Sequence, residues 1–180
     1  QSTISYTLAV NVENLAQAGT SNINATGNAL ANAITGNTGN NLLDGAAGFD
    51  TIQGGSGADT LAGGTGAFSD WLFGGAGDAT RDVFVFKSAT ESAVGTSRDI
   101  VYDFVSGTDD IDLSLIDANV TTAGDQAFLF KGMTATANAV WYVASGSDLI
   151  LRGDINGDTT ADFEIRLASV SSLVVGDFIL

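Results

Sequence analysis

The chain has 180 residues, 44% of them hydrophobic, and is therefore long enough to bury a substantial core. Its 21 acidic and 6 basic residues give a formal net charge of −15, the wrong sign for binding nucleic acids or anionic membranes. The absence of cysteine and histidine excludes disulfides, histidine-ligated zinc sites and Ser-His-Asp triads. No run of eighteen apolar residues occurs, so we expect no transmembrane segment.

Residues 1–26 are expected to form lead-in strands and coil, and a glycine-rich repeat begins after them. Its clearest units, Gly45–Gln53 and Gly54–Ala62, adjoin with a period of nine residues. Each unit opens with glycine, has Asp at its sixth position and has a large apolar residue two positions later. This pattern matches the calcium-binding nonapeptide repeat of parallel β-helical proteins. Because the chain starts at Gln1 without Met or a secretion signal, we expect it to be a segment of a longer protein.

The repeat predicts an all-β fold, a right-handed parallel β-roll over residues 27–86. In six units an Asp or Asn is followed two residues later by an apolar side chain, which indicates a turn and then a short strand whose central side chain points inward. Consecutive strands would lie on opposite sides of a flattened coil, so units two apart should stack. The Asp or Asn positions are Asn32, Asn41, Asp50, Asp59, Asp70 and Asp82, and the apolar positions are Ile34, Leu43, Ile52, Leu61, Leu72 and Phe84.

Stacked turns of this composition are candidate calcium sites. Glycines let the turn adopt backbone angles closed to other residues and leave carbonyl oxygens accessible, and calcium takes six to eight oxygen ligands. Without an ion, stacked carboxylates such as Asp50 and Asp70 would repel by roughly 3–4 kcal/mol, so we expect folding to require several calcium ions. Besides the Asp and Asn positions, the candidate ligand-bearing turn residues are Gly36, Gly39, Gly45, Gly48, Gly54, Gly55, Gly57, Gly63, Gly64, Gly66, Gly74, Gly75 and Gly77.

Two features of the repeat leave alternatives open. The turns that end at Asp70 and Asp82 are longer than the others, so either these carboxylates still reach the ion or the sites are lost or rebuilt with Asp78. Asn32 and Asn41 supply neutral oxygens, so they either form weaker sites or only stabilise turns. A disordered glycine-rich linker and a phosphate-binding loop are disfavoured, because the Asp-to-apolar spacing is strict and no G-K-[ST] sequence follows.

The repeat resembles the RTX (repeats-in-toxin) proteins, which fold as parallel β-rolls. Downstream, residues 82–86 (DVFVF), 89–92 (ATES), 103–107 (DFVSG) and 109–114 (DDIDLS) resemble the C-terminal domain of serralysin-type metalloproteases. The resemblance covers nearly the whole chain and implies a calcium beside the last turn, held by Glu91, Asp99 and Asp109. It also implies a bacterial protein exported by a type I system, with residues 87–180 as a capping and secretion region.

Residues beyond the roll predict ordinary strands, a β-sandwich-like set that caps its open end. The expected strands are Val83–Phe86, Ile100–Phe104, Gln126–Phe130, Val140–Ala144, Asp148–Arg152, Phe163–Leu167 and Val174–Leu180. The acidic segment Asp154–Asp162 fails the EF-hand pattern, and its Asn156-Gly157 dipeptide favours a hairpin, with weak metal binding as the alternative. Trp71, Trp141 and Tyr142 are expected in the core, with stacking on a sugar as the alternative.

The segment Asp177–Leu180, an acid followed by three apolar residues, resembles the C-terminal signal read by type I ABC transporters. The leading hypothesis is therefore a secreted, non-catalytic calcium-binding module for export and extracellular folding, with no nucleic-acid partner. One alternative is a surface-layer, adhesin or glycan-binding module that binds a cell-surface polysaccharide. Another is a fragment of a secreted enzyme whose catalytic domain lies upstream, because this chain lacks the histidines of an H-E-x-x-H motif.

Overall fold

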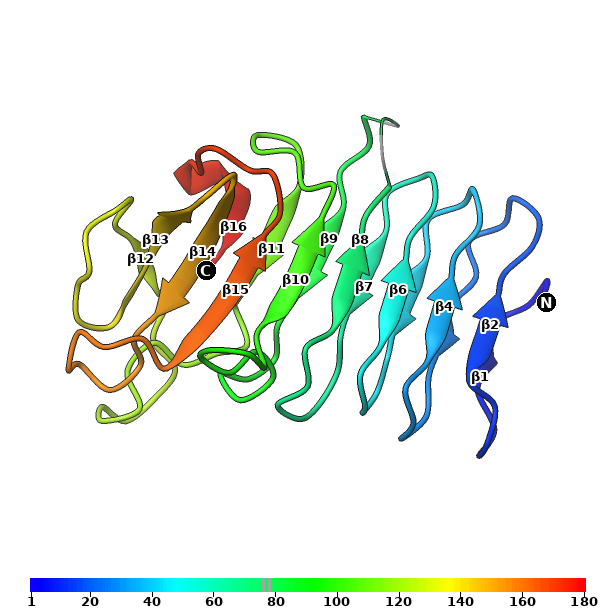
Figure 1. Cartoon of the computed structure of the whole chain (residues 1–180), viewed down its shortest axis with the longest axis horizontal. Helices are drawn as coiled ribbons and strands as arrows, with labels where there is room; N and C mark the ends of the chain where they lie inside the picture. The colour runs from blue at the N-terminus through cyan, green and yellow to red at the C-terminus, as the bar shows by residue number, and fades with distance from the viewer. Residues whose placement is uncertain (76, 78) are drawn as a thin grey trace.

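The computed structural model describes residues 1–75, 77 and 79–180, and the regular secondary structure of this part of the chain is almost entirely β-strand (Figure 1). Its strands form one sheet of seven and one sheet of nine. The first, here called sheet 1, contains in spatial order β1 (Tyr6–Thr7), β3 (Ala25–Thr26), β5 (Leu42–Asp44), β7 (Thr60–Ala62), β9 (Val83–Val85), β11 (Asp110–Asp112) and β16 (Phe178–Ile179). Sheet 2 contains β2 (Asn14–Ala16), β4 (Ala33–Thr35), β6 (Thr51–Gln53), β8 (Trp71–Phe73), β10 (Asp99–Tyr102), β15 (Phe163–Leu167), β14 (Asp148–Gly153), β13 (Ala139–Ser145) and β12 (Leu129–Phe130).

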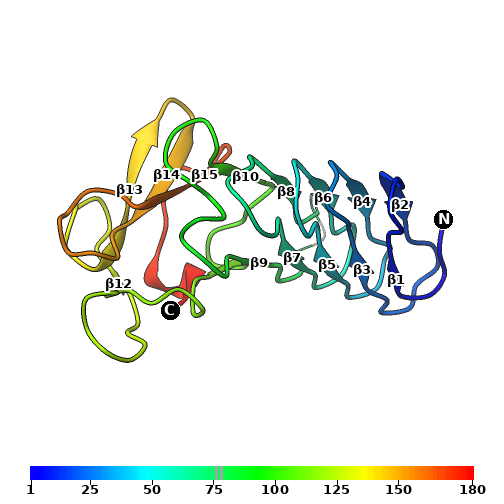
Figure 2. The ribbon, with the colours of Figure 1, turned by 90° about the horizontal axis from the view of Figure 1, so that it is seen from below.

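From β1 to β11 the chain alternates between the two sheets, so each pair of strands completes one coil of a parallel β-roll (Figure 2). The predicted fold class is confirmed. Every neighbouring pair in this stretch is parallel, with Ile34 opposite Ile52 and Ile52 opposite Leu72 in sheet 2. In sheet 1 Leu43 lies opposite Leu61, and Leu61 opposite Phe84.

The core of the roll is the space between the sheets, filled by the central side chain of each strand. All six apolar positions expected to point inward are at most 1% exposed. Burying one such side chain stabilises a fold by about 1.5–3 kcal/mol, so the stacked rows are the main apolar contribution. The strands that carry these six positions, β4 to β9, have only three residues each, and turns connect them at the corners of the coil.

The parallel pairing extends into the segment assigned from sequence to the lead-in. Strand β1 pairs with β3, and β2 pairs with β4, with Leu15 opposite Ile34. The pairing also continues past Phe86, because β8 pairs with β10 and β9 with β11. Roll geometry therefore does not require the glycine-rich turn, which is absent before residue 27 and after residue 82.

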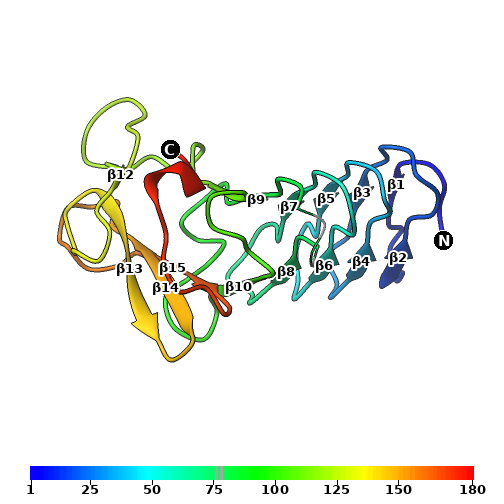
Figure 3. The ribbon, with the colours of Figure 1, turned by 90° about the horizontal axis from the view of Figure 1, so that it is seen from above.

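The cap extends sheet 2 (Figure 3). Strand β15 pairs in parallel with β10, and β13, β14 and β15 form an antiparallel meander. The tight hairpin of the cap is at Gly146-Ser147 between β13 and β14, where Gly146 has φ 67°. The hairpin expected at Asn156-Gly157 is wrong in detail, because β14 and β15 are joined by the longer loop of residues 154–162.

The end of the chain is a 3-10 turn followed by a two-residue strand, so the strand predicted over Val174–Leu180 is too long. The turn η1 covers Val175–Asp177, and β16 then pairs in parallel with β11 at the end of sheet 1. Strand β12 is likewise limited to Leu129–Phe130 of the predicted Gln126–Phe130. Within the described residues, no helix has the length and apolarity needed to cross a membrane.

Candidate metal site

In the described part of the chain, the acidic corners form two ladders, one along each edge of the roll. On one edge the backbone N–H of Asn32 donates to Asp50 Oδ1 at 2.7 Å, and the N–H of Asp50 donates to Asp70 Oδ1 at 2.7 Å. On the other edge Asn41 N–H donates to Asp59 Oδ1 at 2.7 Å and Asp59 N–H to Asp82 Oδ1 at 2.9 Å. The predicted stacking pairs, Asp50 with Asp70 and Asp59 with Asp82, are therefore brought together.

The second carboxylate oxygen of each acid faces the first glycine of its own turn. A Cβ on Gly45 would overlap Asp50 Oδ2 and also the carbonyl oxygen of Gly63 in the next coil. A Cβ on Gly54 would overlap Asp59 Oδ2 and the Gly74 carbonyl oxygen in the same way. Carboxylate and carbonyl oxygens from successive coils thus converge on a space that only glycine leaves free.

The two lengthened turns keep this arrangement. A Cβ on Gly63 would overlap Asp70 Oδ2, and a Cβ on Gly74 would overlap Asp82 Oδ2, as at the shorter turns. In the first of these turns, the additional residues Ala67 and Phe68 are exposed. Asp70 and Asp82 therefore still reach the ladder positions. Asp78, the proposed substitute ligand, lies outside the described residues.

The remaining candidate glycines shape the turns. Gly48, Gly55, Gly57, Gly64, Gly66, Gly75 and Gly77 all have φ between 82° and 156°, the region that favours glycine. Gly36 and Gly39 belong to the degenerate turn before Asn41, where a Cβ would overlap neighbouring backbone atoms of other turns. Ala46 occupies the second glycine position at φ 76°, which is strained for a residue with a Cβ.

The ladder carboxylates are buried, and on the Asp50–Asp70 edge their environment disfavours the ionised form. Burial raises the pKa of Asp50 from 3.8 to about 7; the Asn32 N–H opposes this rise, and the charge of Asp70 adds to it. Burial also raises the pKa of Asp70 to about 6. Because Asp50 Oδ2 is buried without a hydrogen-bond partner among the described residues, the site favours a bound cation.

At the cap end, Asp99 and Asp109 continue the two ladders. The N–H of Asp70 donates to Asp99 Oδ1 at 2.7 Å, and the N–H of Asp82 donates to Asp109 Oδ1 at 3.0 Å. Burial raises the pKa of Asp99 to about 9, and the charges of Asp70 and Glu91 add to this. Glu91 is itself buried, accepts the Lys87 N–H at 2.8 Å and has a raised pKa because of that burial. Glu91 thus faces the Asp70–Asp99 edge, whereas Asp109 belongs to the opposite edge.

The asparagine corners are closed by hydrogen bonds instead. Asn41 Oδ1 accepts the Asn37 N–H at 2.9 Å, and its Nδ2 donates to the Ile23 carbonyl at 2.7 Å. Asn32 Oδ1 accepts the Asn28 N–H at 2.7 Å, and its Nδ2 donates to Asn28 Oδ1 at 3.3 Å. The amide Nδ2 at these corners takes the place of the ladder oxygen Oδ1 of an acidic corner, while the asparagine Oδ1 still faces the first glycine of its own turn and a carbonyl oxygen of the next coil. These corners therefore combine a hydrogen-bonded turn with one neutral oxygen at the position of Asp Oδ2.

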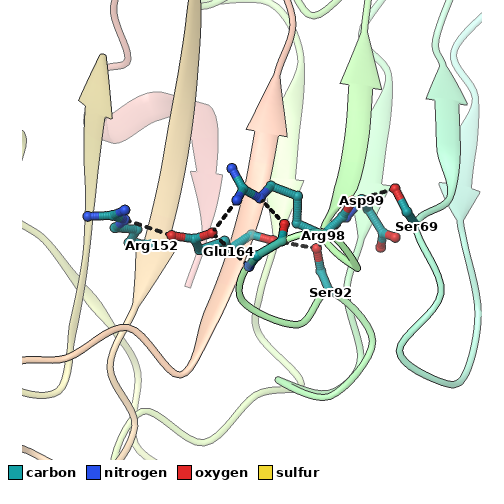
Figure 4. Close-up of polar contacts among 7 residues, drawn as sticks. Ser69, Ser92, Arg98, Asp99, Arg152 and Glu164 are labelled. Atoms are coloured by element: carbon teal, nitrogen blue, oxygen red, sulfur yellow. Dashed lines mark hydrogen bonds and ion pairs between the residues drawn. The ribbon is translucent and has the colours of Figure 1, made fainter. Parts of the chain in front are cut away.

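A network in the cap that the sequence did not predict holds Asp99 in place (Figure 4). Ser92 Oγ accepts the Asp99 N–H at 2.7 Å and donates to the Glu164 carbonyl oxygen. The buried Glu164 carboxylate pairs with Arg152 at 2.9 Å and with Arg98 at 3.1 Å. Ser92, Arg98 and Asp99 are close in the sequence, but Arg152 and Glu164 lie more than fifty residues further on and follow no repeat, so no local pattern indicates the network.

The segment Asp154–Asp162 is a loop built around its own acids. The Asp154 carboxylate accepts N–H groups from Asn156, Gly157, Thr159 and Asn138 at 2.8–3.3 Å. Asp162 accepts the Ile155 N–H at 2.8 Å and the Asn156 amide at 2.8 Å. The oxygens of both acids therefore accept hydrogen bonds from the loop itself and from Asn138, which favours a structural role for these acids over weak metal binding.

The donor set of the ladders fits a hard cation such as calcium. Oxygen atoms supply all the candidate contacts, and each turn contributes one carboxylate together with carbonyl groups. Among the described residues, no group of three or more acidic side chains is placed so that it could hold a metal ion by itself. A site shared between two turns would take one carboxylate from each turn and complete its ligands with carbonyl oxygens. When bound, the ion would supply the positive charge that the stacked carboxylates lack.

Comparisons with known proteins agree with this geometry. The model of the peptidase M10 serralysin C-terminal family matches residues 16–180. No curated protein matches the chain. Among solved structures, the AlgE6R2 subunit of the Azotobacter vinelandii mannuronan C5-epimerase is similar, with 22% identity, a TM-score of 0.56, and 88% of this chain and 92% of that chain covered. The AlgE6R3 subunit of the same enzyme has 24% identity, a TM-score of 0.50, and coverage of 89% and 78%. These likenesses show a shared fold, and the family match shows that the chain belongs to the peptidase M10 serralysin C-terminal family.

Proposed function

We propose that this chain is a non-catalytic module that folds on binding calcium and promotes the export and extracellular folding of a larger bacterial protein. The observation that carries the proposal is the pair of buried carboxylate ladders. Asp50, Asp59, Asp70, Asp82, Asp99 and Asp109 are each at most 3% exposed. Ionised groups of one sign stacked in this way are stable only if cations neutralise them.

Calcium would act on both edges of the roll at once. Each ion would join two successive coils through the Oδ2 atoms and the glycine carbonyls, with Asp50 and Asp70 on one edge and Asp59 and Asp82 on the other. Glu91 and Asp99 would contribute at the cap end of the first edge, and Asp109 at the second. Since the strands between the corners have only three residues, ion binding and coil formation are expected to be one cooperative event.

The terminal segment supports a link between folding and export. Asp177 is fully buried and accepts the Gly107 N–H at 2.7 Å, the Ser106 hydroxyl at 2.8 Å and the Val174 N–H at 2.8 Å. Phe178 and Leu180 pack against the core. A transporter could read Asp177–Leu180 only before this end of the roll folds, which fits a chain kept unfolded in the calcium-poor cytosol and folded outside the cell.

Circular dichroism of the purified chain in excess chelator and then in millimolar calcium tests the folding half. We expect little β-signal with chelator and a cooperative gain on calcium addition; the same β-signal in both conditions refutes it. Removal of Asp177–Leu180 from the whole exported protein tests the export half. We expect secretion to stop while the intracellular protein is still made, and unchanged secretion refutes a signalling role.

A second candidate function, binding of an extracellular polysaccharide, is favoured by one observation on the outer face of sheet 2. Trp71 and Phe49 are about two-fifths exposed there. The other two aromatic residues considered from the sequence do not belong to this surface. Trp141 is only 3% exposed, as the core prediction requires, and Tyr142 stacks on Phe130 in the cap.

A further inference from the structure

Aromatic side chains contact one another on the outer face of sheet 2, the sheet that Figure 1 turns toward the viewer. Since Leu72 and Val101, the neighbouring residues along β8 and β10, are fully buried, Trp71, Phe73 and Tyr102 point outward. The Phe49 and Trp71 rings meet edge to face with centroids 5.5 Å apart, and Trp71 and Tyr102 do the same at 6.2 Å. Tyr102 also stacks on Phe73 with centroids 4.4 Å apart. Here these four residues, Phe49, Trp71, Phe73 and Tyr102, are called the aromatic strip.

Three residues of the strip belong to two rows of side chains that run across strands β4, β6, β8 and β10. In each row, residues on neighbouring strands lie directly opposite one another. The rows follow from the parallel pairing of neighbouring strands. One row is Thr35, Gln53, Phe73 and Tyr102, and the other is Ala33, Thr51, Trp71 and Ile100. Thr35 and Gln53 are exposed, so hydroxyl and amide groups lie beside the rings.

The charge of the side chains in these rows bears on the kind of ligand they suit. All eight described side chains of the two rows are uncharged, although the chain has a net charge of −15. The rows offer an anionic polymer no basic side chain to pair with, and nucleic acid would likewise lack the basic contacts it needs. A flat, uncharged strip of rings with polar groups beside it instead suits a ligand with apolar faces and a hydroxyl rim.

We propose that the aromatic strip binds an uncharged polysaccharide, with the C–H faces of its sugar rings against Trp71 and its neighbours. The hydroxyl groups of the sugar would bond to Gln53 and to threonines of the same rows. A polysaccharide is favoured over a protein because the rows form a narrow line across successive strands, which matches an extended chain. The site needs the folded roll but not the export role, so it rests on calcium-dependent folding alone.

Binding to hydroxyethyl cellulose, laminarin and, as an anionic comparator, alginate tests the proposal by affinity electrophoresis of the calcium-saturated chain. We expect retardation by at least one neutral polymer and none by alginate. In Trp71→Ala we expect a loss of about tenfold or more, as for truncation of a central aromatic contact. Phe68→Ala, which removes an exposed phenylalanine outside the strip, should bind as the unaltered chain does. Retardation by alginate alone, by none of the polymers, or equally in Trp71→Ala overturns the proposal.

Tryptophan fluorescence gives a second readout that does not require Trp71→Ala to fold. The chain has two tryptophans, and Trp141 is buried in the cap, so Trp141→Phe leaves Trp71 as the reporter. A saturable change in its emission with the retarding neutral polymer is expected, and no change contradicts the site. Circular dichroism of each variant with and without calcium separates the outcomes: normal calcium-induced folding without binding refutes only the strip, whereas a calcium-independent fold refutes the folding proposal.

Discussion

The backbone N–H of Asp70 donates to Asp99 Oδ1 at 2.7 Å across a separation of 29 residues. This bond joins the last glycine-rich coil on one edge to the first strand of the cap region. Asp99 is in turn held by Ser92, whose hydroxyl donates to the backbone of β15. The acidic ladder and the cap are therefore one connected structure, and a change in either should be felt in the other.

Replacing Asp50 separates the two roles of a ladder carboxylate. Asp50→Asn keeps an oxygen for the Asn32 N–H but removes the charge, so the folded chain should bind less calcium and lose less stability when calcium is lowered. Asp50→Ala also leaves that buried N–H unpaired, which should cost a further 1–3 kcal/mol or so. Calcium counting and urea unfolding at limiting and at saturating calcium provide the check. Asp103→Asn, at an exposed position off the ladders, is the matched control; equal effects at both positions contradict the ladder's role.

An acid at an asparagine corner should create calcium dependence where there is little. In Asn41→Asp the amide that donates to the Ile23 carbonyl is replaced by a carboxylate oxygen, so two acceptors face each other. We expect destabilisation of about 1–3 kcal/mol at the lowest calcium concentration that folds the unaltered chain, and partial recovery in saturating calcium. Chemical unfolding at both calcium concentrations measures this. If the variant is as stable as the unaltered chain at the lower concentration, the hydrogen bonds at this corner are not what closes it.

Breaking the cap network should weaken calcium binding at a distance from the altered residue. Ser92→Ala removes the acceptor of the Asp99 N–H and the donor to β15, leaving a buried donor unpaired at a cost of about 1–3 kcal/mol. The calcium midpoint of folding should rise, and the transition should become less cooperative. Ser114→Ala, which alters an exposed loop serine, is the control. A calcium titration identical for all three proteins contradicts the coupling.

Asp154 should make the cap sensitive to acid. Burial raises the pKa of Asp154, but its four backbone N–H donors together lower it below 3.8 overall. A carboxyl whose pKa is lowered in the folded state stabilises the fold above its unfolded pKa, and this contribution is lost as the pH falls through the folded pKa. Asp154→Asn should therefore be less stable than the unaltered chain at pH 7 by about 2 kcal/mol, with the difference shrinking toward pH 3.

Urea unfolding of both proteins at several pH values in saturating calcium measures that difference. Any effect of pH on the calcium sites cancels to first order because the two proteins share those sites. Asp158→Asn, in the exposed part of the same loop, is the matched control for the substitution itself. A constant difference between Asp154→Asn and the unaltered chain from pH 7 to pH 3 contradicts the assignment.

The repeat made the roll predictable because one short spacing encodes both a turn and an inward-facing side chain. The positions of Ile52 and Leu61 in the core, and the stacking of Asp50 on Asp70, followed from that spacing alone. The lengthened turns were harder to interpret, since sequence cannot show whether extra residues displace Asp70 or bulge outward. The first coils were also missed as roll, because Leu15 lies in the same row as Ile34 without any glycine pattern to mark it.

The cap was less predictable because its contacts are non-local. Strands β13, β14 and β15 were recognisable from β-branched and aromatic residues, but not that they extend sheet 2. The Ser92–Glu164 contact spans 72 residues and leaves no periodic signal. Asn156-Gly157 has the composition of a tight turn, yet the hydrogen bonds to Asp154 stabilise a longer loop. In these places tertiary contacts outweighed local preference.

The most direct test of the central claim is a crystal structure of the chain grown in calcium, with anomalous diffraction used to locate the ions. The account predicts anomalous peaks between successive coils, within bonding distance of the Oδ2 atoms of Asp50 and Asp70 on one edge and of Asp59 and Asp82 on the other. Water alone between these carboxylates, at calcium concentrations where the chain is folded, would contradict it.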